Sequence, residues 1–129
     1  AAVEILKDIA DGSDEKFSPN ALSKLGMIYQ QNNIPQINFE ESQKIAQKYF
    51  YQVYERFPQS ELAPKSLFMS AYILANELKL YDQATKQYKL FLEKYPNDQL
   101  TASAKIELEN IGLSPEEILK RKTENSNAN

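Results

Sequence analysis

Apolar residues recur with helical spacing in two stretches of the chain that read almost alike, IAQKYFYQVYERFP and ATKQYKLFLEKYP. In both, small or bulky apolar side chains stand at positions i, i+4, i+7 and i+11, which form one stripe on a helix, and a proline follows. The matched positions, each 38 residues apart, are Ala46 and Ala84, Phe50 and Tyr88, Val53 and Phe91, Phe57 and Tyr95, and Pro58 and Pro96. A helix that recurs in this way predicts stacked helical repeats, because one unit cannot bury its apolar face alone.

Similar stripes predict further helices on both sides of these two. The expected helices cover residues 1–11, 20–31, 40–56, 61–78, 82–94 and 99–110, and a last one begins after Ser114. Ser18, Ser60 and Asp98 stand where helix N-caps are expected. Gly26 lies inside a predicted helix, where glycine costs roughly 1 kcal/mol relative to alanine. We therefore expect another helix to cross at Gly26 too closely for a side chain.

The predicted fold class is all-α, with one domain over residues 1–129. We expect an antiparallel stack of helix hairpins of about two and a half repeats, with partial units at both ends. Its predicted parts are an N-terminal helix and loop over 1–17, a first repeat over 18–59, a second repeat over 60–97, a partial third repeat or cap over 98–124, and a tail over 125–129. The first repeat contains a long inter-helix loop, 32–39, which Pro35 keeps out of a helix.

Composition excludes several kinds of chemistry. The chain has 15 Lys and Arg against 18 Asp and Glu, a net charge of −3, which does not favour nucleic acid as a partner. It has no histidine and no cysteine, and so lacks the commonest general base, the commonest transition-metal ligand and any thiol nucleophile. Neighbouring carboxylates such as Glu107 and Glu109 read as solvent-facing helix charges. We expect no catalytic, cofactor-binding or metal-binding residue, and no enzyme activity.

No apolar run approaches the ~20 residues that cross a bilayer, so we expect no direct membrane insertion by this segment. The residues at Ala1 lack the charged and then apolar form of a signal peptide. The chain does not begin with Met, which leaves open a signal peptide or a lipid anchor before Ala1.

The pattern resembles tetratricopeptide repeats over roughly residues 18–110. In the first copy, the positions that match the family signature are Leu22, Leu25, Gly26, Tyr29, Ala46, Phe50 and Pro58. In the second copy, they are Leu67, Ala71, Leu74, Tyr81, Ala84, Tyr88 and Pro96, if the first helix of that repeat is one residue longer than usual. The chain departs from the family in the extra residues of loop 32–39, and in having Leu78, Lys79 and Leu80 where the inter-helix turn normally holds glycine.

The stretches FPQSELAPKSLF and KYPNDQLTASA are most similar to the bacterial cell-envelope branch of this family, which includes periplasmic coordinator proteins and outer-membrane assembly lipoproteins. The resemblance implies a subunit of a periplasmic or outer-membrane-associated complex, with a cytoplasmic location as the alternative. It also implies that another protein is the partner.

The resemblance further implies a groove lined by the first helix of each repeat, which receives a peptide or a helix. The expected groove positions are Asn20, Ser23, Met27 and Gln30 in the first repeat, and Ser66, Met69, Tyr72, Ile73 and Asn76 in the second. Well-known members resemble one another in clamping a C-terminal carboxylate with Lys, Asn and Arg at these positions. The corresponding places here hold Ser23 and Met27, so a mixed apolar and amide surface is expected. The alternative interpretation is that Met27, Met69 and Tyr72 only pack against a neighbouring helix.

These observations predict a non-catalytic adaptor or scaffold that binds another protein in its groove. The alternative is a structural subunit that docks through its terminal repeats into an oligomer or a membrane-associated complex and has no groove ligand.

Overall fold

The computed structural model describes residues 2–127, and within that range it consists of helices and connections without a strand. The elements are α1 (Ala2–Ala10), α2 (Phe17–Gln30), α3 (Phe39–Arg56), α4 (Ala63–Tyr72), the π-helical segment η1 (Ile73–Glu77), α5 (Tyr81–Lys94), α6 (Thr101–Asn110) and α7 (Pro115–Asn127). The predicted all-α class is confirmed.

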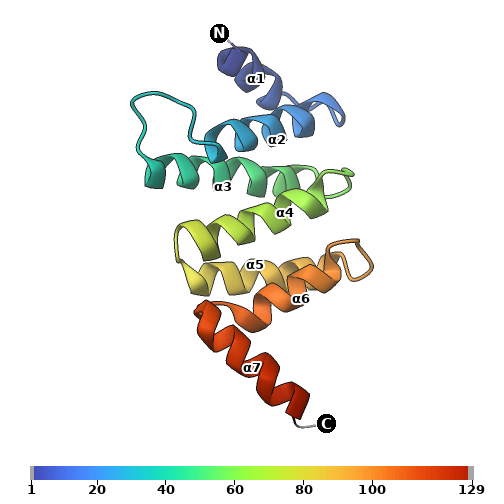
Figure 1. Ribbon diagram of the computed structural model, residues 1–129. Coiled ribbons are helices and arrows are strands. Elements are labelled where there is room, and N and C mark those ends of the chain that lie inside the picture. Colours follow the sequence, from blue (N-terminus) through green and yellow to red (C-terminus); the bar gives the residue numbers. More distant parts are fainter. Residues whose placement is uncertain (1, 128–129) are drawn as a thin grey trace.

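The helices follow one another along the molecule in chain order (Figure 1). From α1 to α6, each helix packs against the next one in the sequence. Helix α7 leaves the end of α6 at an angle and extends away from the stack (Figure 1). No helix within residues 2–127 is both long and apolar enough to cross a membrane.

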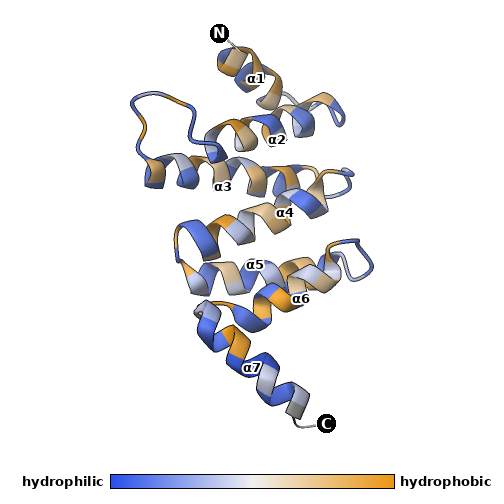
Figure 2. Cartoon of the chain, viewed as in Figure 1, coloured by the Kyte–Doolittle hydropathy of each residue, from blue (hydrophilic) through white to orange (hydrophobic). Residues whose placement is uncertain are grey.

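Two apolar clusters lie between the helices, and hydrophobic and hydrophilic residues alternate around most of the ribbon turns (Figure 2). The first cluster joins α1, α2 and α3 to the start of α4 and to η1, and its largest members include Leu22, Leu25 and Phe50. The second joins α4 and η1 to α5 and α6 around Tyr88 and Phe91. Each helix between α2 and α5 therefore buries apolar residues against a neighbour, as repeated amphipathic helices require.

The 38-residue sequence repeat is also a repeat of backbone geometry. Phe57 ends α3 with φ −133° and ψ 60°, and Tyr95 ends α5 with φ −130° and ψ 61°. Their amides donate to the carbonyl oxygens of Val53 and Phe91 at 2.9 and 2.8 Å. Because a residue in this conformation cannot continue a helix, α3 and α5 end at equivalent positions, and the proline that follows each of them adds no strain.

The connections after these two helix ends match as well. The Ser60 hydroxyl accepts from the Leu62 amide at 3.1 Å, and the Asp98 carboxylate accepts from the Leu100 amide at 3.0 Å. The helices that follow begin later than predicted, α4 at Ala63 instead of residue 61 and α6 at Thr101 instead of residue 99.

The close crossing predicted at Gly26 is confirmed. A Cβ atom placed on Gly26 would lie 2.9 Å from ring carbons Cε1 and Cζ of Phe50. Glycine is therefore needed in α2 to let the Phe50 ring of α3 lie against its backbone.

The prediction that Ser18 caps the second helix is wrong. Helix α2 already begins at Phe17, and Ser18 is fully buried with its hydroxyl donating to the carbonyl oxygen of Ile9 at 2.9 Å. Asp14 supplies the oxygen at this helix start, accepting from the amides of Phe17 and Lys16 at 2.6 and 2.9 Å. These hydrogen bonds hold the pKa of Asp14 below its usual value. Ser18 serves instead to join the end of α1 to the start of α2.

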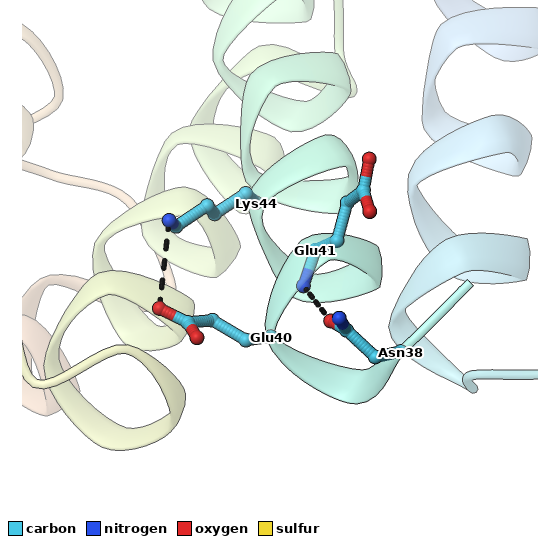
Figure 3. A network of polar contacts seen from close by, with 4 residues as sticks. All are labelled: Asn38, Glu40, Glu41 and Lys44. Carbon is cyan, nitrogen blue, oxygen red and sulfur yellow. Dashed lines mark hydrogen bonds and ion pairs between the residues drawn. The ribbon is translucent and has the colours of Figure 1, made fainter.

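The loop predicted at 32–39 is an irregular connection that ends where Asn38 caps α3. Asn32 and Gln36 have φ values of 57° and 75°. The Asn38 side chain accepts from the Glu41 amide at 2.8 Å, and Lys44 pairs with Glu40 at 3.4 Å one turn later (Figure 3). This ion pair is exposed and contributes little to stability.

The predicted helix 61–78 is not α-helical throughout. It continues as π-helix η1, in which the Leu78 amide donates to the Ile73 carbonyl oxygen five residues earlier at 3.0 Å. Lys79 then turns the chain with φ 54°, at the position where the resemblance leads one to expect a glycine. A π turn holds one residue more than an α turn does.

The predicted tail 125–129 is helical through Asn127, and residues 128–129 lie outside the described part of the chain. The Thr123 hydroxyl donates to the Leu119 carbonyl oxygen at 3.0 Å, and Arg121 donates to the Glu109 carbonyl oxygen at 2.6 Å. The good helix formers Lys120, Arg121 and Lys122 extend α7 beyond its apolar residues.

Candidate protein-binding groove

A groove of about 430 Å³ lies between α2 and α4. Its lining residues are Ser23, Met27 and Gln30 of α2, Phe50 of α3, and Leu62, Lys65, Ser66 and Met69 in and before α4. Phe50 is almost fully buried and closes the bottom of this groove. We call these eight residues the first groove segment.

The shape of the groove follows from the helix packing around Gly26. Because Gly26 lets Phe50 lie against α2, the next residue of α2, Met27, stands at the edge of the groove with 48% of its surface exposed. Met69, on the opposite wall, is half-buried and packs against the first apolar cluster. The interpretation that these residues only fill the core therefore fits Met69 better than Met27.

A partly buried chain of hydrogen bonds joins α3, α4 and α5. The Gln47 amide of α3 donates to the Ser70 hydroxyl of α4 at 2.9 Å, and that hydroxyl donates to the side-chain oxygen of Gln87 in α5. At the C-terminal end of α2, the Ser42 hydroxyl and the Gln43 amide of α3 donate to the carbonyl oxygens of Tyr29 and Gln30 at 2.6 and 2.8 Å. Hydrogen bonds of this kind help to fix the relative position of helices, here of the two groove walls. The side-chain oxygen of Gln43 is buried without a partner among the described residues.

The structure brings together five of the nine expected groove residues, Ser23, Met27, Gln30, Ser66 and Met69. Asn20 is exposed near the start of α2, outside the lining. Asn76 is exposed in η1, where its amide donates to the Tyr72 carbonyl oxygen at 3.2 Å. Tyr72 is half-buried nearer the C-terminal end of α4.

The expectation for Ile73 is wrong, and that for Ser66 agrees with the structure. Ile73 is fully buried in the first apolar cluster, because it follows Tyr72 by one residue and is therefore turned about 100° around the helix. Ser66 lines the groove.

Sequence reasoning missed three lining residues, Phe50, Leu62 and Lys65. Lys65 stands four residues before Met69, a spacing that places both on one helix face and could have identified it. The apolar stripe predicts Phe50 in the core, where it does lie, and it also lines the groove.

The lining combines four apolar side chains with two hydroxyls, one amide and the ammonium group of Lys65. Such a surface can bury an apolar side chain and hydrogen-bond to a backbone. Among the residues that the structure describes, no group of three or more acidic side chains is placed to hold a metal ion.

Comparison with known protein families found no family model that matches the chain, and comparisons with curated proteins and with solved structures found no match.

Proposed function

We propose that this chain is a non-catalytic protein-interaction module that binds a peptide or a helix of another protein in the first groove segment. The supporting observation is the groove itself, a mostly apolar hollow with a few polar groups and a 48% exposed methionine at its edge. Methionine adapts its shape to different apolar partners, and an exposed one beside a groove is a suitable contact.

The proposal includes a tetratricopeptide-like arrangement of the helices. Two features support it: α2 packs on α3 and α4 on α5, and the ends of α3 and α5 repeat the same geometry at a distance of 38 residues. In such an arrangement, affinity comes from burying the apolar lining, and specificity comes from polar groups such as Gln30 and Ser66 that must be paired in the complex.

A double substitution tests the groove. Peptides selected from a random display library on the unmodified chain would be measured by fluorescence anisotropy against Met27→Glu/Met69→Glu. We expect at least about tenfold weaker binding, since two carboxylates would be desolvated by the ligand. The matched control Ile106→Glu changes an apolar residue that is 55% exposed on α6. Equal binding to all three proteins would contradict the proposal.

We further propose that the protein is an adaptor or accessory subunit of a complex in a bacterial cell envelope. This part is supported by the similarity of the stretches around Pro58 and Pro96 to envelope proteins. Reading the gene upstream of Ala1 tests it: a signal peptide or a lipidated cysteine is expected, and a cytoplasmic start with neither would contradict it.

The alternative function is a structural subunit that docks through its ends. The observation that favours it is exposed apolar surface at both ends of the stack, with Ile5 61% exposed on α1, Ile106 55% on α6 and Leu119 67% on α7. Removing residues 114–129 should then abolish assembly measured by sedimentation, while the groove double substitution leaves it unchanged.

A further inference from the structure

The two helices that form the walls of the first groove segment carry only basic charge. Within residues 2–127, α2 and α4 are the two α-helices without an aspartate or a glutamate, and each carries one charged residue, Lys24 in α2 and Lys65 in α4. Each of the other described α-helices contains at least two acidic residues. The groove walls are therefore basic in a chain whose net charge is −3.

Both lysines lie at the groove and are free to meet a ligand. Lys65 is exposed and lines the groove. Lys24 is exposed on α2 three residues before Met27, a spacing that places the two side chains on one face of the helix. Neither ammonium group forms an ion pair with a residue between 2 and 127, and Glu61, which precedes α4, does not pair with Lys65. One unpaired positive charge thus accompanies the apolar lining on each wall.

The position of Lys65 is unfavourable for the free chain. Helix α4 begins at Ala63, so Lys65 lies in its first turn, where the partial positive charge of a helix N-terminus favours an acidic side chain. Helices α1, α3, α5 and α7 have an acidic residue in the first turn, and α4 has none. Helix stability therefore does not explain a cation here, whereas a bound carboxylate would be attracted by both the lysine and the helix terminus.

A buried hydroxyl stands next to Lys65 in the same wall. Ser66 is 2% exposed and lines the groove, and its hydroxyl forms no hydrogen bond with a residue that the structure describes. One turn later in α4, the hydroxyl of the buried Ser70 does find a partner, the side-chain oxygen of Gln87. A buried hydroxyl without a partner is costly. Because Ser66 faces the groove, an oxygen of a ligand in the groove can accept its hydrogen bond.

We propose that the ligand of the first groove segment is an acidic peptide segment, in which an apolar side chain is flanked by aspartate or glutamate. The apolar side chain enters the groove toward the Phe50 ring. The flanking carboxylates pair with Lys24 and Lys65, and the Ser66 hydroxyl donates to an oxygen of the ligand. A basic segment is repelled by both lysines, so charge selects the ligand. This inference rests on the proposed function, because it names the ligand class of the same groove.

Three peptide display libraries test the inference on the unmodified chain. The libraries share their random apolar positions and differ in the flanking positions, which hold Asp or Glu in the first, Asn or Gln in the second, and Lys or Arg in the third. We expect the tightest binders from the acidic library. Its best peptide, acetylated at the N-terminus and amidated at the C-terminus, should bind at least fivefold more tightly than its Asn and Gln version in fluorescence anisotropy.

Charge reversal of the chain tests the same pairing from the other side. Lys24→Glu/Lys65→Glu should bind the acidic peptide at least tenfold more weakly, and should bind the best basic peptide more tightly than the unmodified chain does. The matched control Lys48→Glu/Lys105→Glu changes the net charge equally at exposed residues outside the lining, and should stay within twofold. Lys65→Glu alone should keep or raise the Tm, which separates lost binding from lost folding.

Equal binding of acidic and neutral peptides, or unchanged binding by Lys24→Glu/Lys65→Glu, would overturn the inference. Acidic peptides that bind only with a free C-terminus would overturn it too, because the carboxylate would then be that of the chain end. Met27→Ser/Met69→Ser removes the apolar walls without adding charge. If peptides of all three libraries bind equally and lose affinity in this variant, only the inference is wrong. If no peptide loses affinity in it, the proposed function is wrong and the inference falls with it.

Discussion

Gly26 of α2 and Phe50 of α3 approach so closely that no side-chain atom fits between them: a Cβ on Gly26 would lie 2.9 Å from two ring carbons. The ring is 3% exposed and closes the bottom of the first groove segment, so it cannot move outward without filling that groove. This one contact therefore determines both the spacing of the first helix pair and the depth of the groove.

Gly26→Ala is expected to destabilise the chain although alanine favours a helix by about 1 kcal/mol. Overpacking a buried site costs roughly 1–3 kcal/mol, and here the obstacle is a whole ring instead of a flexible chain end. Urea unfolding would measure a net loss on the order of 1 kcal/mol. Phe50→Leu makes room for the methyl group, so Gly26→Ala should destabilise the Phe50→Leu protein less than it destabilises the unmodified chain. A Gly26→Ala protein that is more stable than the unmodified chain would refute the close contact.

Tyr88→Phe is expected to stabilise the free chain by about 1 kcal/mol, because it removes a buried hydroxyl that has no partner among the described residues. Tyr95→Phe is the matched control, since the Tyr95 hydroxyl donates to the Pro58 carbonyl oxygen at 2.9 Å. The control should leave stability unchanged or lower it slightly. Thermal and urea unfolding should show a gain in stability for Tyr88→Phe and no gain for Tyr95→Phe, and a destabilised Tyr88→Phe would mean that the hydroxyl is paired.

The periodic features of the sequence predicted the structure best. The 38-residue repeat and the Gly26 crossing depend on apolar spacing and on side-chain size, both of which can be read along the chain. The Ser18 cap was predicted wrongly because Asp14 and Ser18 both suit a helix start. The choice between them depends on Ile9, whose carbonyl oxygen takes the Ser18 hydroxyl only once α1 and α2 have packed together.

The groove was predicted in part for a similar reason. Ser23, Met27, Gln30 and Met69 follow from helix phase, which α2 and the first turns of α4 preserve. The expectation for Ile73 is wrong because this residue is turned into the core, one residue after Tyr72. Asn76 lies beyond the start of the π-helix, where the α-helical phase no longer holds. The unpaired hydroxyl of Tyr88 could not be inferred from sequence at all, because it depends on where every neighbouring donor and acceptor lies.

Arg56→Leu is expected to loosen α1. The guanidinium of Arg56 donates to the carbonyl oxygens of Ala10 and Gly12 at 2.9 and 2.7 Å, and so ties the end of α1 to the end of α3. Hydrogen bonds from a charged group contribute about 1.5–3 kcal/mol, less where they are exposed. Hydrogen exchange should speed up in α1 while α5 keeps its protection. Arg56→Lys should restore part of the protection of α1, and an unchanged exchange rate in α1 of Arg56→Leu would contradict this role of Arg56.

Lys79→Gly is expected to stabilise the chain by up to about 1 kcal/mol, because Lys79 has a φ of 54° that glycine adopts without steric cost. Asn32→Gly is the comparison, with a φ of 57° at a residue that tolerates this region better than lysine does. The gain at Asn32 should therefore be smaller. Equal gains at both positions in urea unfolding, or a loss at Lys79, would argue against backbone strain at the turn.

Deletion of Asn76 is expected to be tolerated. Asn76 is exposed in η1, and a π turn holds one residue more than an α turn, so its removal lets α4 continue as a regular helix into the turn at Lys79. We expect a change in unfolding free energy within about 1 kcal/mol, since the buried side chains before η1 keep their positions. Deletion of Lys48 is the control: it is equally exposed but lies within regular α3, where losing one residue turns every later side chain by about 100° and exposes Val53. That variant should not fold, as judged by circular dichroism. If both deletions unfold the chain, η1 is required by the packing of Ile73 and Leu74 and does not simply accommodate an extra residue.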